Sequence, residues 1–350
     1  MQRRSQRTRI ADVARAAGVS KTAVSFAFNS PERLAAETAA RIRGVADRLG
    51  YRPHPVARLL TQRQTMTLGI LTPQPLAVVF SNPFFALFCE GVAQAAEEAG
   101  YELHFISPLH GSLARAVDRS TVDGVVAIGL SGDHPEVEQI RASGVPMVLV
   151  DADDLPEHSS VVVEDEAGAR AAAEHLIELG HREILVIAVE GPLLVGGERP
   201  RTGVADRRLR GYRAAIEAAG IELAAGWIVA ARSSIDGGAA AFHEGWARGL
   251  RPTAVLAMSD AIAVGAMRAA RDLGLAVPDQ LSVIGFDDVD LAAHVDPPLT
   301  TIHQPIRQKG ADAVRLLLLE VAGDEPGAPE QLRLPTGLVL RASTAPAPAR

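Results

Sequence analysis

The chain has 350 residues, 47% of them hydrophobic and 22% charged, which excludes a disordered protein and exceeds the length of one ordinary domain. No run of about eighteen apolar residues could span a bilayer, no apolar signal-peptide segment follows the basic start MQRRSQRTRI, and a single cysteine, Cys89, excludes a disulfide framework or a thiolate metal site. Residues 1–64 hold 13 Lys and Arg against 4 Asp and Glu, whereas the rest of the chain holds 22 against 38. We therefore expect a cytoplasmic protein without a membrane partner. Its body is acidic, and its basic N-terminal segment is expected to bind a polyanion or an acidic partner. A solvated tail is the alternative for this segment.

The first predicted elements are two short helices. The first begins after Thr8, a favourable N-cap residue, and ends at Gly18, and its apolar side chains recur at the helical spacing: Ile10, Val13, Ala14 and Ala17. Ser20 can cap a second helix, KTAVSFAFN, whose apolar face consists of Val24, Ala27 and Phe28. Two short helices across a tight turn with glycine predict a helix-turn-helix, which places its second helix in the major groove of DNA.

A third helix is predicted from about Ala36 to Leu49, with Gly50 as its C-terminal stop. Three helices are enough to close a small core around the apolar faces. The opposite face of the second helix then carries the side chains that we expect to contact DNA: Lys21, Thr22, Ser25 and Phe26. Three residues at the helix ends are added to this DNA-binding set: Thr8, Ser20 and Asn29.

The segments TRIADVARAAGVSKTAVSFAFN and TAARIRGVADRLGYRPHPVARLL resemble the DNA-binding headpiece and hinge of the LacI/GalR family of bacterial transcriptional regulators. Later segments resemble landmarks of that family in the expected order: VDGVVAIG, HLIELGHREI, RLRGYRAAI, SVIGFDD and PPLTTIHQP. The resemblance implies a sequence-specific DNA-binding regulator, expected to be a repressor, whose operator affinity is controlled by a small-molecule effector. It divides the chain into a headpiece at 1–52, a hinge helix and linker at 53–64, and an effector-binding and dimerisation domain at 65–345.

Three residues depart from the family pattern, which commonly has Thr, Arg and Ser where this chain has Ala23, Phe26 and Ala35. An alanine N-cap lowers helix stability by about 1 kcal/mol relative to serine. Arginine at position 26 would suit a bidentate contact with guanine, whereas phenylalanine offers only apolar contact, for example with a thymine methyl group. We therefore predict that the residue at position 26 makes no bidentate contact with a guanine of the operator. Packing of Phe26 on its own headpiece or a neighbouring helix is the alternative.

The linker from Tyr51 to Arg63 contains two prolines and then VARLLTQR, a helix-compatible segment too short to be stable alone. By resemblance this is the hinge helix that orders when two subunits meet on DNA. The resemblance assigns pairing and DNA contacts to five of its residues: Val56, Ala57, Arg58, Leu60 and Thr61. Leu60 would wedge into the minor groove and kink the site. A plain interdomain linker is the alternative.

From Met66 onward, short β-rich runs alternate with helical stretches, which predicts parallel sheets of right-handed βαβ units repeated in two halves. By resemblance, PPLTTIHQP and the helix at 305–322 return to the first half. The expected fold class is therefore α/β, with two Rossmann-like lobes of the periplasmic-binding-protein type behind the three-helix headpiece. We expect lobe 1 to hold about 65–158 and 297–325, and lobe 2 about 159–296 and 326–345.

Ligands of open parallel sheets bind at the carboxyl ends of the strands. By resemblance an effector cleft is lined there by nine residues: Phe80, Asn82, Phe84, Phe85, Asp151, Arg208, Ser259, Asp260 and Asp287. Carboxylates with one arginine suit a polyol, because each carboxylate accepts two hydroxyl hydrogen bonds, so a sugar or sugar derivative is the expected effector. The alternatives are core packing for one of Phe84 and Phe85 and a capping role for Asp151. Asp288 is expected to form hydrogen bonds within a turn or hinge.

Motifs of enzymes are missing from the sequence. Neither GxGxxG nor GxxxxGK[ST] follows a predicted strand, and the ten histidines include no HExxH. We expect no enzyme, no cofactor and no metal. The competing hypothesis is a two-lobed sugar receptor without DNA regulation, which would need a signal peptide in place of the basic head.

The expected assembly is a homodimer on an operator with approximate two-fold symmetry, because one recognition helix reads only a half-site. The C-terminal ASTAPAPAR has no heptad pattern, which favours a dimer over a tetramer.

Overall fold

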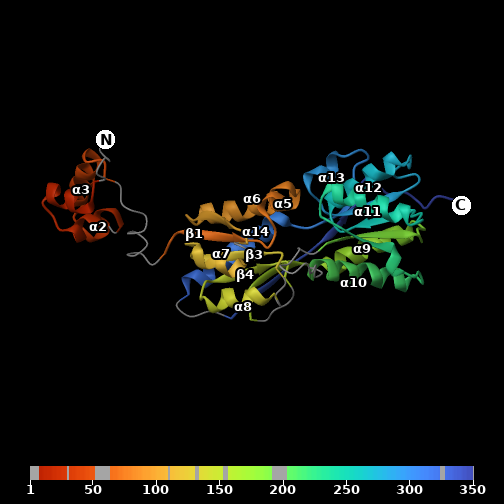
Figure 1. Ribbon diagram of the computed structural model, residues 1–350, viewed down its shortest axis with the longest axis horizontal. Coiled ribbons are helices and arrows are strands. Elements are labelled where there is room, and N and C mark those ends of the chain that lie inside the picture. Colours follow the sequence, from red (N-terminus) through yellow and green to blue (C-terminus); the bar gives the residue numbers. More distant parts are fainter. Residues whose placement is uncertain are drawn as a thin grey trace. The chain divides into compact units, whose positions relative to one another are not determined.

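The structure is a computed structural model that describes residues 8–29, 31–51, 64–108, 111–130, 134–152, 157–190, 203–323 and 328–349. Its contacts divide the chain into two compact units, residues 1–65 and 66–350, both drawn in Figure 1. The predicted hinge residues lie outside the described residues: Val56, Ala57, Arg58, Leu60 and Thr61. Their pairing and DNA contacts therefore stay predictions.

The first unit contains the three predicted helices. They are α1 (Ile10–Ala17), α2 (Lys21–Asn29) and α3 (Ala36–Arg48), with a single 3₁₀ turn, η1 (Pro31–Arg33), between the second and third. Gly18 ends α1 in the left-handed conformation with φ +65°, as a C-terminal glycine stop requires. The predicted apolar faces meet in one core, whose fully buried members are Val13, Val24, Ala27, Ile42 and Ala46.

The helix caps differ from the predicted ones at one helix. The Ser20 hydroxyl accepts a hydrogen bond from the Ala23 amide at 3.1 Å and caps α2 as predicted. Arg9, not Thr8, is the N-cap residue of α1, and its amide donates to the Asp12 carboxylate at 3.0 Å. Thr8 was predicted to cap this helix, but its hydroxyl donates to the Leu49 carbonyl at 2.8 Å, because the chain before α1 runs against the end of α3.

Ala35 is the N-cap of α3 and supplies no side-chain hydrogen bond, although its ψ of 136° suits a capping serine. We expect Ala35→Ser to stabilise α3 by about 1 kcal/mol, because the hydroxyl can accept from an amide of the first turn. Amide hydrogen exchange in the full chain should show exchange from α3 slowed about five-fold. Ser20→Ala is the matched opposite change and should accelerate amide exchange from α2. If Ser20→Ala changed the exchange from α2 but Ala35→Ser left the exchange from α3 unchanged, the expectation for position 35 would be wrong.

The second unit contains two six-stranded sheets. The strands of the first lobe lie in the order β11 (Gln331–Leu334), β5 (Ser160–Val163), β4 (Met147–Val150), β3 (Gly124–Ile128), β1 (Thr67–Leu71) and β2 (Glu102–Ile106). Those of the second lobe lie in the order β12 (Gly337–Val339), β10 (Thr300–His303), β9 (Ser282–Asp287), β8 (Ala254–Ala257), β6 (Ile184–Val189) and β7 (Ile228–Ala231). All pairs are parallel, as predicted, except β12, which runs antiparallel to β10.

Helices cover both faces of each sheet (Figure 1). In the first lobe, α6 (Pro83–Glu98) and α14 (Ile306–Ala322) pack on one face, and α7 (Leu113–Arg119) and α8 (Pro135–Ala142) on the other, with the short α5 (Leu76–Ser81) before α6. In the second lobe, α11 (Ile235–Ala247), α12 (Asp260–Asp272) and α13 (Asp290–His294) lie on one face, and α9 (Asp165–Glu178) and α10 (Gly203–Ala218) on the other; η2 (Ala225–Trp227) precedes β7. Among the described helices, none has the length and apolar composition needed to cross a membrane.

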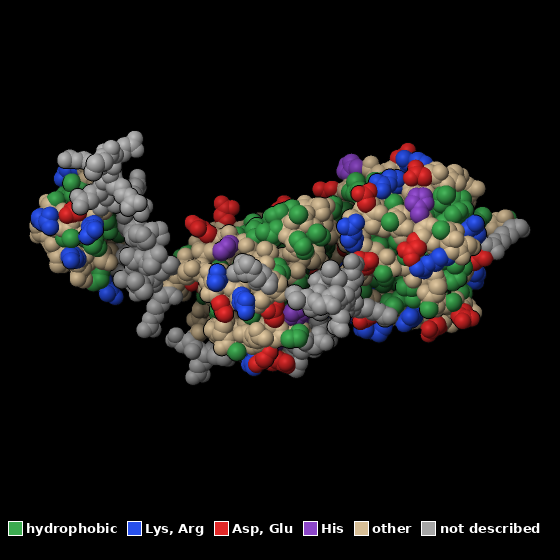
Figure 2. Space-filling view, in the orientation of Figure 1, with side chains coloured by type: hydrophobic (Ala, Val, Ile, Leu, Met, Phe, Trp, Pro, Cys, Tyr) green, Lys and Arg blue, Asp and Glu red, His purple; other side chains and the backbone are tan. Residues whose placement is uncertain are grey.

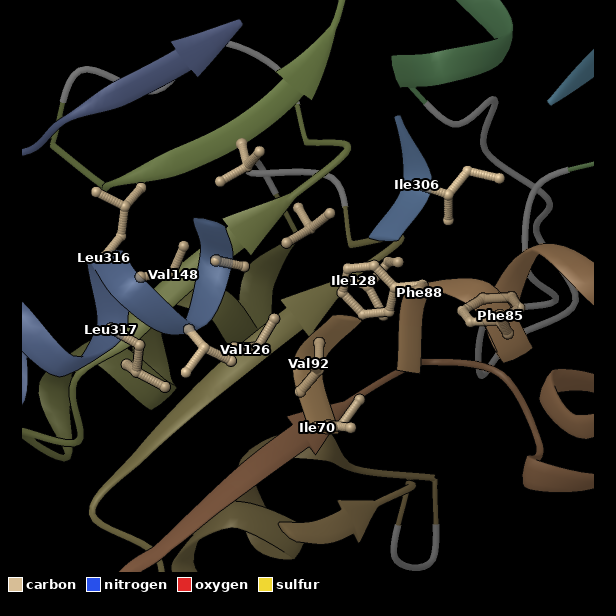
Figure 3. Packing of buried hydrophobic residues seen from close by; sticks show 14 of the residues in the cluster. Ile70, Phe85, Phe88, Val92, Val126, Ile128, Val148, Ile306, Leu316 and Leu317 are labelled. Carbon is tan, nitrogen blue, oxygen red and sulfur yellow. The ribbon is translucent and has the colours of Figure 1, made fainter. Parts of the chain in front are cut away.

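The core under α6 and α14 fixes how closely these two helices approach. Buried side chains from both helices and from the sheet interdigitate in Figure 3, including Phe88, Val126 and Leu317. At Gly91 the helices are so close that a Cβ atom would lie 1.9 Å from the Arg307 carbonyl oxygen. A larger residue there would push α14 away from α6.

The lobe boundaries predicted from the sequence are wrong by one strand at each crossing. Both β5 and β11 were assigned to lobe 2 but pair in the first sheet, and β10 was assigned to lobe 1 but pairs in the second. The chain crosses only after each of these strands ends, so a strand's sheet is set by a partner distant in sequence. The placement of α14 in the first lobe agrees with the prediction.

Candidate DNA-binding surface and effector site

The recognition helix α2 has the orientation that its sequence predicts. Val24 and Ala27 are fully buried, whereas Lys21 and Thr22 are exposed. Ser25 and Phe26 are half-buried on the same outer side, and the side chain of Asn29 lies outside the described part of the chain. Figure 2 shows Lys and Arg side chains on the visible face of this unit. The geometry permits the predicted DNA contacts, which stay predictions.

Several headpiece arginines have structural partners. Arg41 donates to the Ala17 carbonyl at 2.7 Å and Arg43 to the Ala27 carbonyl at 2.9 Å, so both side chains bind a carbonyl within or at the end of a neighbouring helix. Arg33 is different, because its guanidinium carbon lies over an aromatic ring, 5.4 Å from the centroid of Phe26.

In the second unit, buried charged and polar side chains meet where the two lobes face each other. We call this group the interlobe cluster, and its members are Asp151, Asp165, Arg207, Arg208, Asp287, Gln304 and Lys309. Asp151 follows β4 with φ +59°, and Asp287 ends β9 with φ +126°, so two left-handed backbone positions direct carboxylates of different lobes into the cluster. Strain of this kind is typical of functional sites.

Arg208 is the centre of the part that belongs to lobe 2. Its Nε donates to Asp165 Oδ1 at 2.8 Å, and its Nη1 donates to the Met258 carbonyl and lies 3.8 Å from Asp287 Oδ1. The guanidinium carbon lies 3.5 Å from the centroid of the Phe286 ring, which holds the fork in one orientation. A fixed, buried fork of this kind can hold an oxygen of a bound ligand at low entropic cost.

Lys309 connects this group to lobe 1. The side chain is fully buried in α14, and its Nζ donates to Asp151 Oδ1 and to Gln304 Oε1, both at 2.7 Å. Gln304 in turn donates to Asp287 Oδ1 at 2.7 Å. A continuous chain of hydrogen bonds therefore runs from Asp151 of one lobe to Asp287 of the other.

Two further contacts cross between the lobes. Arg207 donates to the backbone carbonyls of Asp151 and Ala152 at 3.4 and 3.2 Å, while its Nε binds Asp165 at 3.0 Å. On the other side, the Asn82 amide donates to Ser233 Oγ at 3.4 Å. Contacts of this kind stabilise one arrangement of the lobes and would break on opening.

Burial and neighbouring charges set the ionisation of the aspartates. Burial raises the pKa of Asp287 to about 6, although the charge of Arg208 opposes the shift. Burial also raises the pKa of Asp260 well above its usual value, and the charge of Asp287 adds to this. For Asp165, burial favours the neutral form, but the charges of Arg208 and Arg207 outweigh it and lower the pKa.

A raised carboxyl pKa has a defined effect on stability. Because Asp287 titrates near 6 in the folded chain and near 3.8 when exposed, the unfolded chain releases this proton first as the pH rises. The quantity to compare is the free energy of unfolding, taken as the wild-type value minus the value for Asp287→Asn. We expect this difference to fall between pH 4 and 6 and to stay constant above pH 6. Urea unfolding at a series of pH values measures this difference, and a difference that rises with pH would contradict the shift.

The structure brings some of the predicted effector residues together and separates others. Asp151, Arg208 and Asp287 lie in the interlobe cluster, and Asn82 reaches Ser259 through Ser233, whose hydroxyl lies 3.0 Å from that of Ser259. Phe84 is half-buried, with its ring centroid 5.3 Å from Lys309 Nζ.

Three other predicted effector residues lie outside the interlobe cluster. Phe85 is in the lobe 1 core (Figure 3), the position expected for one of the two aromatic residues. Asp260 is fully buried at the start of α12; its carboxylate accepts from the Thr301 hydroxyl and from the Val289 amide, which leaves it a structural role in lobe 2. Phe80 is 66% exposed on α5, where Figure 2 shows hydrophobic surface, and packs edge-on to Phe105.

Asp288 forms hydrogen bonds near the crossings between the lobes, as expected for a residue of a turn or hinge. One carboxylate oxygen accepts from Arg341 at 2.6 Å and the other lies 3.0 Å from His303 Nδ1. These partners belong to the strand β10 and to the segment after β12, so Asp288 ties together chain segments near the crossings.

Four members of the interlobe cluster were not among the residues predicted from the sequence: Asp165, Arg207, Gln304 and Lys309. Asp165 and Gln304 stand just beyond the ends of β5 and β10, so the strand-end rule applied to every strand would have found them. Lys309 interrupts the buried face of α14, three residues after Ile306, and a charge on an apolar stripe is a signal for a buried partner. Within the part of the chain that is described, no group of three or more His, Cys, Asp or Glu is placed to hold a metal ion.

A DNA-reading helix on a small basic unit, with a buried polar cluster between two α/β lobes, defines a transcription regulator controlled by a small molecule. Comparisons with known proteins agree. The family model "Bacterial regulatory proteins, lacI family" matches residues 9–54, and the model "Periplasmic binding protein-like domain" matches residues 173–344. The HTH-type transcriptional regulator DegA of Bacillus subtilis (strain 168) is 32% identical over 349 residues, which cover 97% of this chain and 99% of DegA.

Solved structures show the same similarity. The complex of the transcriptional regulator CelR with cellobiose has a TM-score of 0.72 at 30% identity and covers 96% of this chain and 100% of CelR. The lac repressor dimer bound to operator and the anti-inducer ONPF has a TM-score of 0.81 at 28% identity and covers 97% of this chain and 100% of that one. The chain belongs to the LacI family of bacterial regulatory proteins. It is a DNA-binding transcription regulator controlled by an effector, and the family consists of regulators rather than enzymes.

Proposed function

We propose that this chain is a repressor that binds a two-fold symmetric operator as a homodimer, in the cytoplasm, and that a sugar or sugar derivative bound between its lobes controls operator affinity. The observation that carries the effector proposal is the interlobe cluster, in which Asp287 lies 3.8 Å from the fixed fork of Arg208 and is linked to Asp151 of the facing lobe through Gln304 and Lys309. Carboxylates and a guanidinium together can bind the hydroxyls and ring oxygen of a sugar. The similar CelR structure contains cellobiose, and the similar lac repressor structure is a dimer on its operator, which supports both parts of the proposal.

The mechanism that we propose is a change in lobe closure. Contacts such as Arg207 to the Ala152 carbonyl and Asn82 to Ser233 cross between the lobes and would break if the lobes moved apart. A sugar that binds one arrangement more tightly shifts the population toward it. We infer that this changes the spacing of the two hinge helices in the dimer, and with it their ability to pair on the operator.

DNA binding is tested by a mobility-shift titration of the full chain with DNA from upstream of its own and neighbouring genes, repeated at rising salt. The expected result is binding at least a thousand-fold tighter to one fragment than to an unrelated duplex, with affinity for both falling steeply with salt. Equal affinity for all fragments would contradict a sequence-specific repressor.

The effector is tested by a thermal-shift screen of neutral mono- and disaccharides, cellobiose and ribose among them. A sugar that binds the folded chain raises the unfolding temperature with increasing concentration, and the same sugar should change the operator affinity. If none does so while operator binding is intact, the sugar proposal is wrong and the regulator needs an effector of another class. No specific observation favours the two-lobed receptor without DNA regulation, since the headpiece is a complete three-helix unit.

A further inference from the structure

Phe26 occupies the position on the recognition helix where the family commonly has an arginine, and the structure brings another arginine to the same place. Arg33 extends from the turn η1, and its guanidinium carbon lies 5.4 Å from the centroid of the Phe26 ring. Arg33 is exposed, whereas Phe26 is half-buried. The positive charge that position 26 lacks is therefore supplied beside that position by a residue seven positions further along the chain.

The surroundings of Arg33 differ from those of the other headpiece arginines. Arg15 pairs with Asp12, and Arg41 and Arg43 donate to backbone carbonyls. Among the described side chains, the Phe26 ring is the partner seen for Arg33. A guanidinium that lies over a ring face has its five N–H donors in its own plane, so these donors can still bind another group. The ring also restricts the arginine side chain, so that less conformational entropy is lost when those donors bind.

We propose that Phe26 is a platform rather than a base-reading residue, and that it holds Arg33 against a phosphate of the operator backbone. This inference rests on the proposed DNA-facing side of α2. In a helix-turn-helix the N-terminal residues of the recognition helix contact base edges. Arg33 follows the C-terminal end of α2, so it lies toward the border of the groove, where the phosphates are. The guanidinium fork matches phosphate geometry.

The test measures binding of the full chain to two duplexes of equal length by fluorescence anisotropy: the upstream fragment that binds most tightly and an unrelated sequence. Arg33→Gln should weaken binding to both duplexes by a similar several-fold factor, because phosphates carry no sequence information. The slope of log affinity against log salt should become shallower by about 0.9, the value for one phosphate. Arg48→Gln is the matched control: it removes the same charge from an exposed position at the end of α3 and should change the affinity less than two-fold without changing the slope.

The platform is tested by a double-mutant cycle. Phe26→Leu keeps an apolar side chain but removes the ring, so in that background Arg33→Gln should lose much less affinity than in the wild type. Phe26→Tyr keeps the ring and should retain the wild-type salt slope, which distinguishes loss of the platform from damage to the headpiece.

Three results would overturn the inference. Equal effects of Arg33→Gln and Arg48→Gln would mean that only overall charge matters. A loss confined to the specific fragment and abolished by one base change, with the salt slope unchanged, would make Arg33 a base-reading residue. Additive effects of Phe26→Leu and Arg33→Gln would remove the platform. Failure of the wild-type chain to distinguish the two duplexes would instead contradict the proposed sequence-specific repressor.

Discussion

Lys309→Met is expected to destabilise the second unit by about 3–5 kcal/mol, which is typical when one partner of a buried ion pair is removed. Lys309 is fully buried, and its Nζ is a donor to Asp151 Oδ1 and to Gln304 Oε1, both at 2.7 Å. Methionine fills similar space and keeps an apolar contact with Phe84, but it leaves the Asp151 carboxylate without its cation. Most of the lost free energy of unfolding should therefore come from the uncompensated charge of Asp151 and little of it from a cavity. Urea unfolding followed by far-UV circular dichroism gives the change in free energy.

A second substitution distinguishes the charge from the packing. Asp151→Asn removes the carboxylate charge, and asparagine tolerates the left-handed φ of +59° at this position. In the double variant with Lys309→Met, at least half of the lost stability should return, because neither partner is then a lone buried charge. Arg315→Gln is the control on the same helix: its pair with Glu330 is half exposed, and its loss should change the stability by less than about 1 kcal/mol. A loss below about 1 kcal/mol for Lys309→Met would show that the ion pair has no structural importance.

The headpiece could be predicted from the sequence almost residue by residue, because its signals are local. Gly18 and Ser20 mark the end of one helix and the start of the next, and the structure places α2 at Lys21–Asn29, the segment predicted. The fold class of the body followed from the alternation of strands and helices in the same way. The sheet to which β5, β10 and β11 belong could not be predicted, since it depends on which distant strand each one pairs with.

From the strand pattern, the proposed effector site was predictable only where a residue follows the end of a strand, whereas Arg208 in α10 was predicted from the family resemblance. Asp151 and Asp287 satisfy that rule, whereas Lys309 enters the site from the buried face of a helix that has crossed from the other lobe. The orientation of the aromatic pair could have been found from spacing: Phe85 begins a stripe with Phe88 and Val92 that is buried in the core. This leaves Phe84 on the neighbouring side, where it faces Lys309.

Arg208→Lys is expected to weaken the response to the sugar strongly while leaving the chain folded. Lysine keeps a positive charge for Asp165, but its single ammonium cannot replace a fork that binds Asp165 and the Met258 carbonyl and, in our proposal, a ligand oxygen as well. Hydrogen bonds to charged groups contribute about 1.5–3 kcal/mol each, so the affinity for the sugar should fall about 10- to 100-fold. The thermal shift given by that sugar should therefore be clearly smaller at concentrations that just saturate the wild type.

Operator affinity gives an independent measurement of the same substitution. Because the described partners of Arg208 all belong to lobe 2, Arg208→Lys should bind the operator in the absence of sugar as the wild type does, and the same concentration of sugar should change that affinity much less. Arg210→Gln is the matched control two residues along α10, where an exposed arginine pairs with Glu166 at 3.0 Å, and both the thermal shift and the operator response should persist in it. If Arg208→Lys kept the full thermal shift, the fork would not touch the sugar. If it lost the thermal shift but operator affinity still responded to sugar, the regulatory site would lie elsewhere in the body, and the interlobe cluster would serve only to hold the lobes together.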